Sequence, residues 1–208
     1  IFVGNDGKAA AMAEHMFGAC VDIDNFIYLF SGSGVGGALF LDGVVYKGEG
    51  GLAGELGHIK IVPQGRFCSC GASGCLSPYL SEPALIEEIC RLGTARPTSL
   101  AEVIELAEAG DAIVLNVLDH AGDVLGSAVS SLINIFNPPL VLLGGGLALA
   151  APYLAAPLER AVRRLAHPAM YSSDIVKFAD PNVGGLRLGG IALALDGVTD
   201  IAGANVLP

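Results

Sequence analysis

Four side chains that bind soft metal ions lie close together in the segment 58–75. Their donors are one imidazole and three thiols: His58, Cys68, Cys70 and Cys75. Together they would complete the tetrahedral shell of Zn²⁺ and leave no position open for a substrate. The sequence therefore predicts a structural zinc ion. Two other interpretations stay open, a disulfide with one free thiol or simply small buried residues. C-x-C is a poor disulfide pair, and the chain has an odd total of 5 cysteines, so both facts favour the metal.

Three further stretches have residue types that suit ligand binding. Asn5 and Asp6 lie where a strand-like end meets a predicted helix over 8–17, so the carboxylate can cap the helix or face a cleft. A glycine-rich segment covers residues 31–37, and a second follows a predicted strand as Gly144, Gly145 and Gly146. Backbone N–H groups of such segments can wrap a phosphate. A helix cap and tight turns explain the same residues without any ligand.

The elements that must position these groups alternate between strands and helices. Asp42-Gly43 predicts a two-residue hairpin turn. Strands are expected over 25–30, 38–41, 44–46, 140–143 and 175–178. Helices are expected over 8–17, 83–92 with Ser81 as a cap, 99–109, 111–136 and 154–164, and a closing helix over 184–195 is implied only by the family resemblance described below. This order predicts a mixed α/β fold. The long helix over 111–136 is expected in the core, and it is also a candidate dimer face.

Composition limits the kinds of partner that the chain can have. Its 208 residues are 52% hydrophobic and 15% charged, with a net charge of −10, so it is expected to be globular and not to bind nucleic acid itself. The apolar runs are expected to be too short to span a membrane. The absence of a signal peptide and the thiol cluster favour the cytoplasm. The start without Met, in a strand-like run, suggests a fragment.

The order of these motifs resembles the ROK family of bacterial sugar kinases and sugar-responsive repressors (the NagC/Mlc-like regulators). The resemblance rests on G-E-L-G-H at 54–58 followed by C-S-C-G-A-S-G-C at 68–75, and it extends from Asn5 to about Asp196. It implies the actin-like ATPase fold (sugar-kinase, ribonuclease H-like), with residues 1–22 as a remnant of the first lobe and 23–208 as the second lobe. The family's first phosphate loop and any DNA-binding domain would lie outside this sequence.

The resemblance also implies roles for individual residues. The family's sugar ligands correspond to Asn5, Asp6, Glu55 and His58. Asp6 would be the catalytic base if the protein is a kinase, and His58 would use one ring nitrogen for zinc and the other for the sugar. The phosphate and nucleotide contacts would come from Gly32, Ser33, Gly34, Gly36, Gly37, Gly144, Gly145 and Gly146.

Two departures from the family pattern weaken the kinase interpretation. Gly7-Lys8 follows Asn5-Asp6 where the family has Ala-Asn, and a lysine there could pair with the base and lower its pKa. Ser77 stands where the family usually has a sugar-binding glutamate.

The function expected first is therefore the sugar-sensing domain of a transcriptional repressor. It would bind a sugar or sugar phosphate, form a homodimer or homotetramer, and meet DNA only through an N-terminal domain absent here. An ATP- and Mg²⁺-dependent hexose kinase is the alternative, and a degenerate oligomerisation domain is the third.

Overall fold

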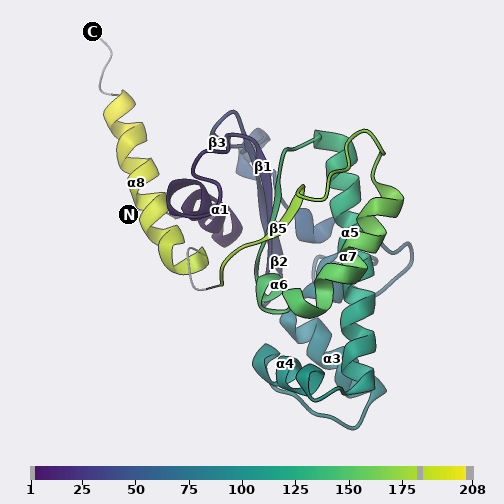
Figure 1. Cartoon of the computed structure of the whole chain (residues 1–208). Coiled ribbons are helices and arrows are strands. Elements are labelled where there is room, and N and C mark those ends of the chain that lie inside the picture. The colour runs from purple at the N-terminus through teal and green to yellow at the C-terminus, as the bar shows by residue number, and fades with distance from the viewer. Residues whose placement is uncertain (1–2, 182–184, 205–208) are drawn as a thin grey trace.

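A five-stranded mixed sheet forms the centre of the computed structural model, which describes residues 3–181 and 185–204 (Figure 1). Its strand order is β3-β2-β1-β4-β5, and the pairs β1–β4 and β4–β5 are parallel while β1–β2 and β2–β3 are antiparallel. The strands are β1 (Phe26–Ser31), β2 (Val35–Leu41), β3 (Val44–Val45), β4 (Val141–Gly145) and β5 (Val176–Phe178).

Helices cover both faces of this sheet. The helices are α1 (Asp6–Phe17), α2 (Ser77–Leu80), α3 (Glu82–Leu92), α4 (Leu100–Glu108), α5 (Ala112–Phe136), α6 (Gly146–Leu149), α7 (Ala151–Leu165) and α8 (Gly185–Ala204), with short 3-10 turns at Glu49–Gly51 and Leu56–His58. In Figure 1, α1 and α8 lie on one side of the sheet and α5 and α7 on the other. Alternate residues of β1 face the two cores: Phe26 and Tyr28 pack with α1, and Ile27 and Leu29 pack with α5 and α7.

Helix α5 is the spine of the larger core. It packs along α7, where Gly122 and Gly126 allow close approach because an added Cβ would meet Pro157 and Ala161. By length and composition α5 could cross a membrane, which corrects the expectation that every apolar run is too short. More than half of its most apolar stretch (56%) is buried inside the protein, as in the core helix of a globular domain.

Most expected elements are present with boundaries shifted by up to three residues, but the helix expected over 184–195 is observed as α8 and continues to Ala204. The turn at Asp42 and Gly43 has the positive φ angles (54° and 77°) of the predicted hairpin. The glycine-rich segment differs, because pairing of Ser31 with Val35 leaves a turn of only Gly32, Ser33 and Gly34 and places Gly36 and Gly37 inside β2. Ser81 occupies the N-cap position of α3, but its side chain makes no capping hydrogen bond.

Candidate functional site

The start of β2 is the point where two segments that carry predicted ligand residues meet. A Cβ on Gly7, at the start of α1, would lie 2.9 Å from the backbone nitrogen of Gly37. A Cβ on Gly54 would lie 3.2 Å from the carbonyl oxygen of the same Gly37, and one on Gly57 would collide with the carbonyl of Val35. Only residues without a side chain permit these approaches, so the motif glycines bring the Asn5-Asp6 and Glu55–His58 segments onto one strand.

Asn5 and Asp6 form the exposed N-terminus of α1. The Asn5 side chain caps the helix by accepting a hydrogen bond from the Lys8 backbone nitrogen at 3.2 Å, and Asp6 accepts one from the Gly7 nitrogen at 2.8 Å. Lys8 does not pair with Asp6 among the described residues; its ammonium donates to the carbonyl of Gly51. Lys8 therefore ties the segment that leads to Glu55 onto α1.

The two glycine segments meet at the carboxyl ends of neighbouring parallel strands. Ser31 of β1 pairs with Gly145 of β4, and a Cβ on Gly146 would lie 2.8 Å from the Ser31 hydroxyl. Such an edge of an α/β sheet is the usual place for a ligand crevice. Gly145 is exposed and adopts a φ of 60°, whereas Gly144 is buried beneath the Tyr28 ring. Gly36 and Gly37 are strand residues, and their lack of a side chain makes room for Phe30 and Leu56.

The four predicted metal donors converge, with all ligand atoms within 4.8 Å of one another. The Cys68 sulfur lies 3.5 Å from Nδ1 of His58, and the Cys70 and Cys75 sulfurs are 3.6 Å apart. Tetrahedral zinc, with bonds of about 2.3 Å to sulfur and about 2.0 Å to nitrogen, separates neighbouring donors by about 3.5–3.8 Å. These residues can therefore hold a zinc-sized ion. Nδ1 of His58 faces the Cys68 sulfur, so Nε2 is not needed as a metal ligand.

The metal loop (residues 58–75) is built to hold its thiols in place. Lys60 pairs with Cys75 and Phe67 with Ser73 as antiparallel bridges. Gly71 and Gly74 make the sharp bends with φ angles of 86° and 77°.

The thiols of the cluster lie in different surroundings, and burial raises the pKa of Cys75 above its usual value. The ammonium of Lys60, 2.7 Å from the Cys75 sulfur, offsets negative charge in the cluster. The backbone N–H of Ala72, followed by the neighbouring thiols, lowers the pKa of Cys70 to about 7, which favours the thiolate that a metal requires.

Ser77 is engaged inside the protein. Its hydroxyl oxygen accepts a hydrogen bond from the backbone nitrogen of Val35 at 3.1 Å, so it fixes the start of β2 beside the Gly32–Gly34 turn. The same turn is held from α3, where the Glu82 nitrogen donates to the Gly32 carbonyl at 2.9 Å.

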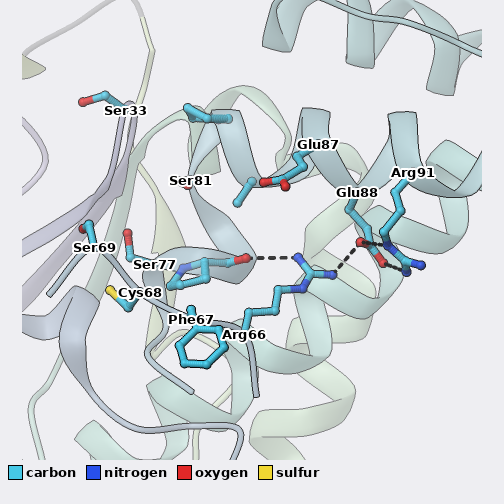
Figure 2. Close-up of a pocket in the computed structure, with 13 residues that line it drawn as sticks. Ser33, Arg66, Phe67, Cys68, Ser69, Ser77, Ser81, Glu87, Glu88 and Arg91 are labelled. Atoms are coloured by element: carbon cyan, nitrogen blue, oxygen red, sulfur yellow. Dashed lines mark hydrogen bonds and ion pairs between the residues drawn. The ribbon is translucent and has the colours of Figure 1, made fainter. Parts of the chain in front are cut away.

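A pocket of about 550 Å³ lies beside Ser77, and Figure 2 shows the residues that line it. Arg66 crosses its floor: one guanidinium nitrogen donates to the Pro78 carbonyl at 3.0 Å, another lies 3.0 Å from Glu88, and the group stacks over Tyr79. The sequence patterns did not predict this pocket, the roles of Lys60 and Arg66, or the Lys8–Gly51 contact. For Lys60, its alternation with the apolar Ile59 and Ile61 was a signal that could have indicated its role.

Comparisons with known proteins identify the family. The family model described as "ROK family" matches residues 1–196. A glucokinase from Thermotoga maritima is 33% identical over 175 residues, covering 78% of this chain and 55% of that protein. A xylose repressor from Bacillus spizizenii is 31% identical over 173 residues, covering 83% of this chain and 44% of that protein. The chain thus spans about half the length of these relatives.

Structural comparison agrees with the sequence comparison. The crystal structure of a ROK family transcriptional regulator, a homolog of the E. coli MLC protein, superposes with a TM-score of 0.82 at 33% identity, covering 92% of this chain and 50% of that one. Both kinases and regulators therefore resemble this chain to a similar degree. The chain belongs to the ROK family and has its actin-like ATPase fold.

Proposed function

We propose that this chain is the sugar-binding effector domain of a ROK-family transcriptional regulator. The observation that carries this proposal is Ser77. It replaces the glutamate that the family usually presents to the sugar, and its hydroxyl is taken up by the Val35 nitrogen. The site therefore keeps groups that can hold a sugar but loses one acidic contact of the kinase pattern.

The sugar would be held by Asn5, Asp6, Glu55 and His58. Support comes from the close approach of the glycines beside them to the start of β2 and from the exposure of Asn5, Asp6 and Glu55. Carboxylate and imidazole groups suit a sugar or sugar phosphate, because each can hold hydroxyl groups in fixed directions.

Zinc would be the structural ion of the metal loop. His58 would bind it through Nδ1 and would leave Nε2 for the sugar, since a metal-bound histidine normally donates its second N–H to a partner. The ion would thus set the orientation of one sugar ligand. Such an ion supplies folding free energy rather than a reaction step, because four protein donors fill its shell.

The regulator would act in the cytoplasm as a homodimer or homotetramer. DNA would be contacted through a part of the protein outside this sequence, which agrees with the net charge of −10 of this chain. We take residues 1–22 as belonging to the first lobe and 23–208 to the second.

Calorimetric titration of the full-length gene product with glucose, xylose and their phosphates tests this proposal. Glu55→Gln should abolish sugar binding, whereas Glu49→Gln, an exposed residue of the preceding turn, should leave it unchanged. Hexose-dependent release of ADP at an ordinary enzyme rate would refute the regulator assignment.

An ATP- and Mg²⁺-dependent hexose kinase is the second candidate. It is favoured by the exposed carboxylate of Asp6, free of a lysine partner among the described residues, and by the glycine turns at the ends of β1 and β4. Asp6 would be the general base that deprotonates the attacking hydroxyl, and the turns would hold phosphate. Asp6→Asn should then abolish turnover and leave sugar binding nearly intact; unchanged turnover excludes this candidate.

A further inference from the structure

We propose that the pocket beside Ser77 is a second carbohydrate subsite, so that the ligand of this protein is a disaccharide or a larger glycoside and not a free monosaccharide. This inference rests on the sugar-binding function proposed above. It names the chemical class of the ligand, which the proposed function leaves open.

The pocket adjoins His58 of the proposed sugar site through Cys68 of the metal loop. Ser77 and Cys68 both line it, and Cys68 lies 3.5 Å from the His58 ring. A glutamate at position 77, as the family usually has, would carry its carboxylate beyond the position of the short serine side chain. Because the Ser77 hydroxyl is turned to the Val35 nitrogen, the space next to it stays open. A substituent on the sugar could pass through this space.

The chemistry of the lining suits an uncharged polyol. Hydroxyl groups come from three elements of the chain: the β1–β2 turn (Ser33), the metal loop (Ser69) and the start of α3 (Ser81). Figure 2 shows Ser33, Ser69 and Ser77 on one side of the pocket and the charged residues of α3 on the other. Hydroxyl groups can donate and accept, as can the hydroxyls of a sugar.

The charges in the pocket are balanced. Two arginines and two glutamates line it, and Glu88 is bound by both Arg66 and Arg91. A lining without net charge gives no preference to a phosphate or another anion. Among the residues that the structure describes, the Glu87 carboxylate has no hydrogen-bond or ion-pair partner, and it is exposed, so it is ready to accept hydrogen bonds from ligand hydroxyls.

Phe67 adds an apolar surface at the edge of the pocket. The residue is 89% exposed, and its backbone is held by pairing with Ser73. An exposed aromatic ring on such a backbone can cover the apolar C–H face of a sugar ring while the sugar hydroxyls reach polar neighbours. A volume of about 550 Å³ lies within the range of pockets that hold small ligands.

The test compares matched monosaccharides and disaccharides by calorimetric titration of the full-length protein. The probes are glucose against cellobiose and maltose, and xylose against xylobiose. We expect at least one disaccharide to bind about tenfold more tightly than its monosaccharide, because it would gain one or two hydrogen bonds and the ring contact. Phe67→Ala and Glu87→Gln should remove this gain and leave monosaccharide binding unchanged.

Glu108→Gln is the control, because this exposed residue at the end of α4 lies outside the pocket lining. If a monosaccharide binds and no disaccharide binds more tightly, or if the gain survives in both pocket variants, the second subsite is wrong while the sugar-binding function stands. If neither these sugars nor the phosphates of glucose and xylose bind, the proposed function itself is overturned, and the subsite falls with it.

Discussion

Two irregular segments flank the 3-10 turn Leu56–His58, and they are held in different ways. The metal loop (residues 58–75) has two antiparallel bridges and four converging donors. It is also anchored by Arg66, whose backbone nitrogen donates to the Tyr79 hydroxyl at 2.9 Å. The connecting segment 47–54 has one short turn and four glycines with positive φ: Gly48, Gly50, Gly51 and Gly54. A backbone bond from Ala53 to Lys47 and the side chain of Lys8 hold it.

The difference shows how contacts make an irregular segment rigid, and Ile59, Ile61 and Val62 of the metal loop also pack against the larger core. Glycines allow both segments to bend, but they increase the conformational entropy lost on folding. In the metal loop many contacts within a short sequence separation offset this loss. In the segment 47–54 few contacts do so, and every residue from Tyr46 to Leu52 is exposed. We therefore expect His58 to be held rigidly, and Glu55, on the other side of the turn, to depend on a mobile neighbour.

Breaking the metal cluster should have the largest effect. Cys70→Ser removes one donor of four, so we expect loss of about one bound zinc ion per chain and a fall of roughly 4 kcal/mol in the free energy of unfolding. Elemental analysis and urea unfolding measure these two quantities. Cys90→Ser, a half-buried thiol on α3 outside the cluster, is the matched control and should keep the metal. A metal-free protein of unchanged stability would show that no structural ion exists.

A pair of glycine substitutions separates strain from crowding within the metal loop. Gly74→Ala places a Cβ against the Val62 carbonyl at a φ of 77°, so we expect a loss of roughly 2–4 kcal/mol. Gly71→Ala has a similar φ of 86° but nothing within 4 Å, so only backbone strain of about 1 kcal/mol should remain. Thermal unfolding measures both; equal losses would mean that crowding at Gly74 is relieved by local movement.

Removing the tether of the connecting segment should change its mobility more than the stability of the protein. Lys8→Met deletes the hydrogen bond to the Gly51 carbonyl while keeping most of the side-chain volume. We expect a loss of about 1 kcal/mol or less in unfolding free energy, with faster amide hydrogen exchange over 48–54. Lys47→Met, an exposed residue of the same segment, is the control. Unchanged exchange in Lys8→Met would show that backbone contacts alone hold this segment.

The smallest effect should be the pH dependence of the ion pair between Arg66 and Glu88. Hydrogen bonds from Arg91, and then the charge of Arg66, lower the pKa of Glu88 below its usual value. The ionised form is thus favoured in the folded state, so its contribution is present above the unfolded-state pKa and is lost as the pH falls through the folded-state pKa. The stability difference between wild type and Glu88→Gln should therefore shrink in acid. A difference that stays constant between neutral and acidic pH would rule out a role for this charge.

Patterns between near neighbours were readable from the sequence. Asp42-Gly43 predicts its turn because few residue pairs accept two positive φ angles. The spacing of His58, Cys68, Cys70 and Cys75 predicts one donor cluster, and the structure confirms that they converge. Whether that cluster holds zinc stays a prediction, as do the roles of the sugar and phosphate residues. The order of motifs was sufficient to predict the ROK family and the actin-like fold, and the comparisons confirm both.

Only the tertiary structure decided which groups meet across the chain. Ser77 bonds to Val35, Lys8 bonds to Gly51 instead of Asp6, and Gly36 lies within a strand and not in a loop. Each of these outcomes depends on long-range packing, in which strand register and helix placement choose among partners that local propensity leaves equivalent. The pocket that brings Ser33, Phe67 and Glu87 together has the same origin. Its three walls come from separate elements, and no local rule on spacing relates a strand turn, a metal loop and a helix.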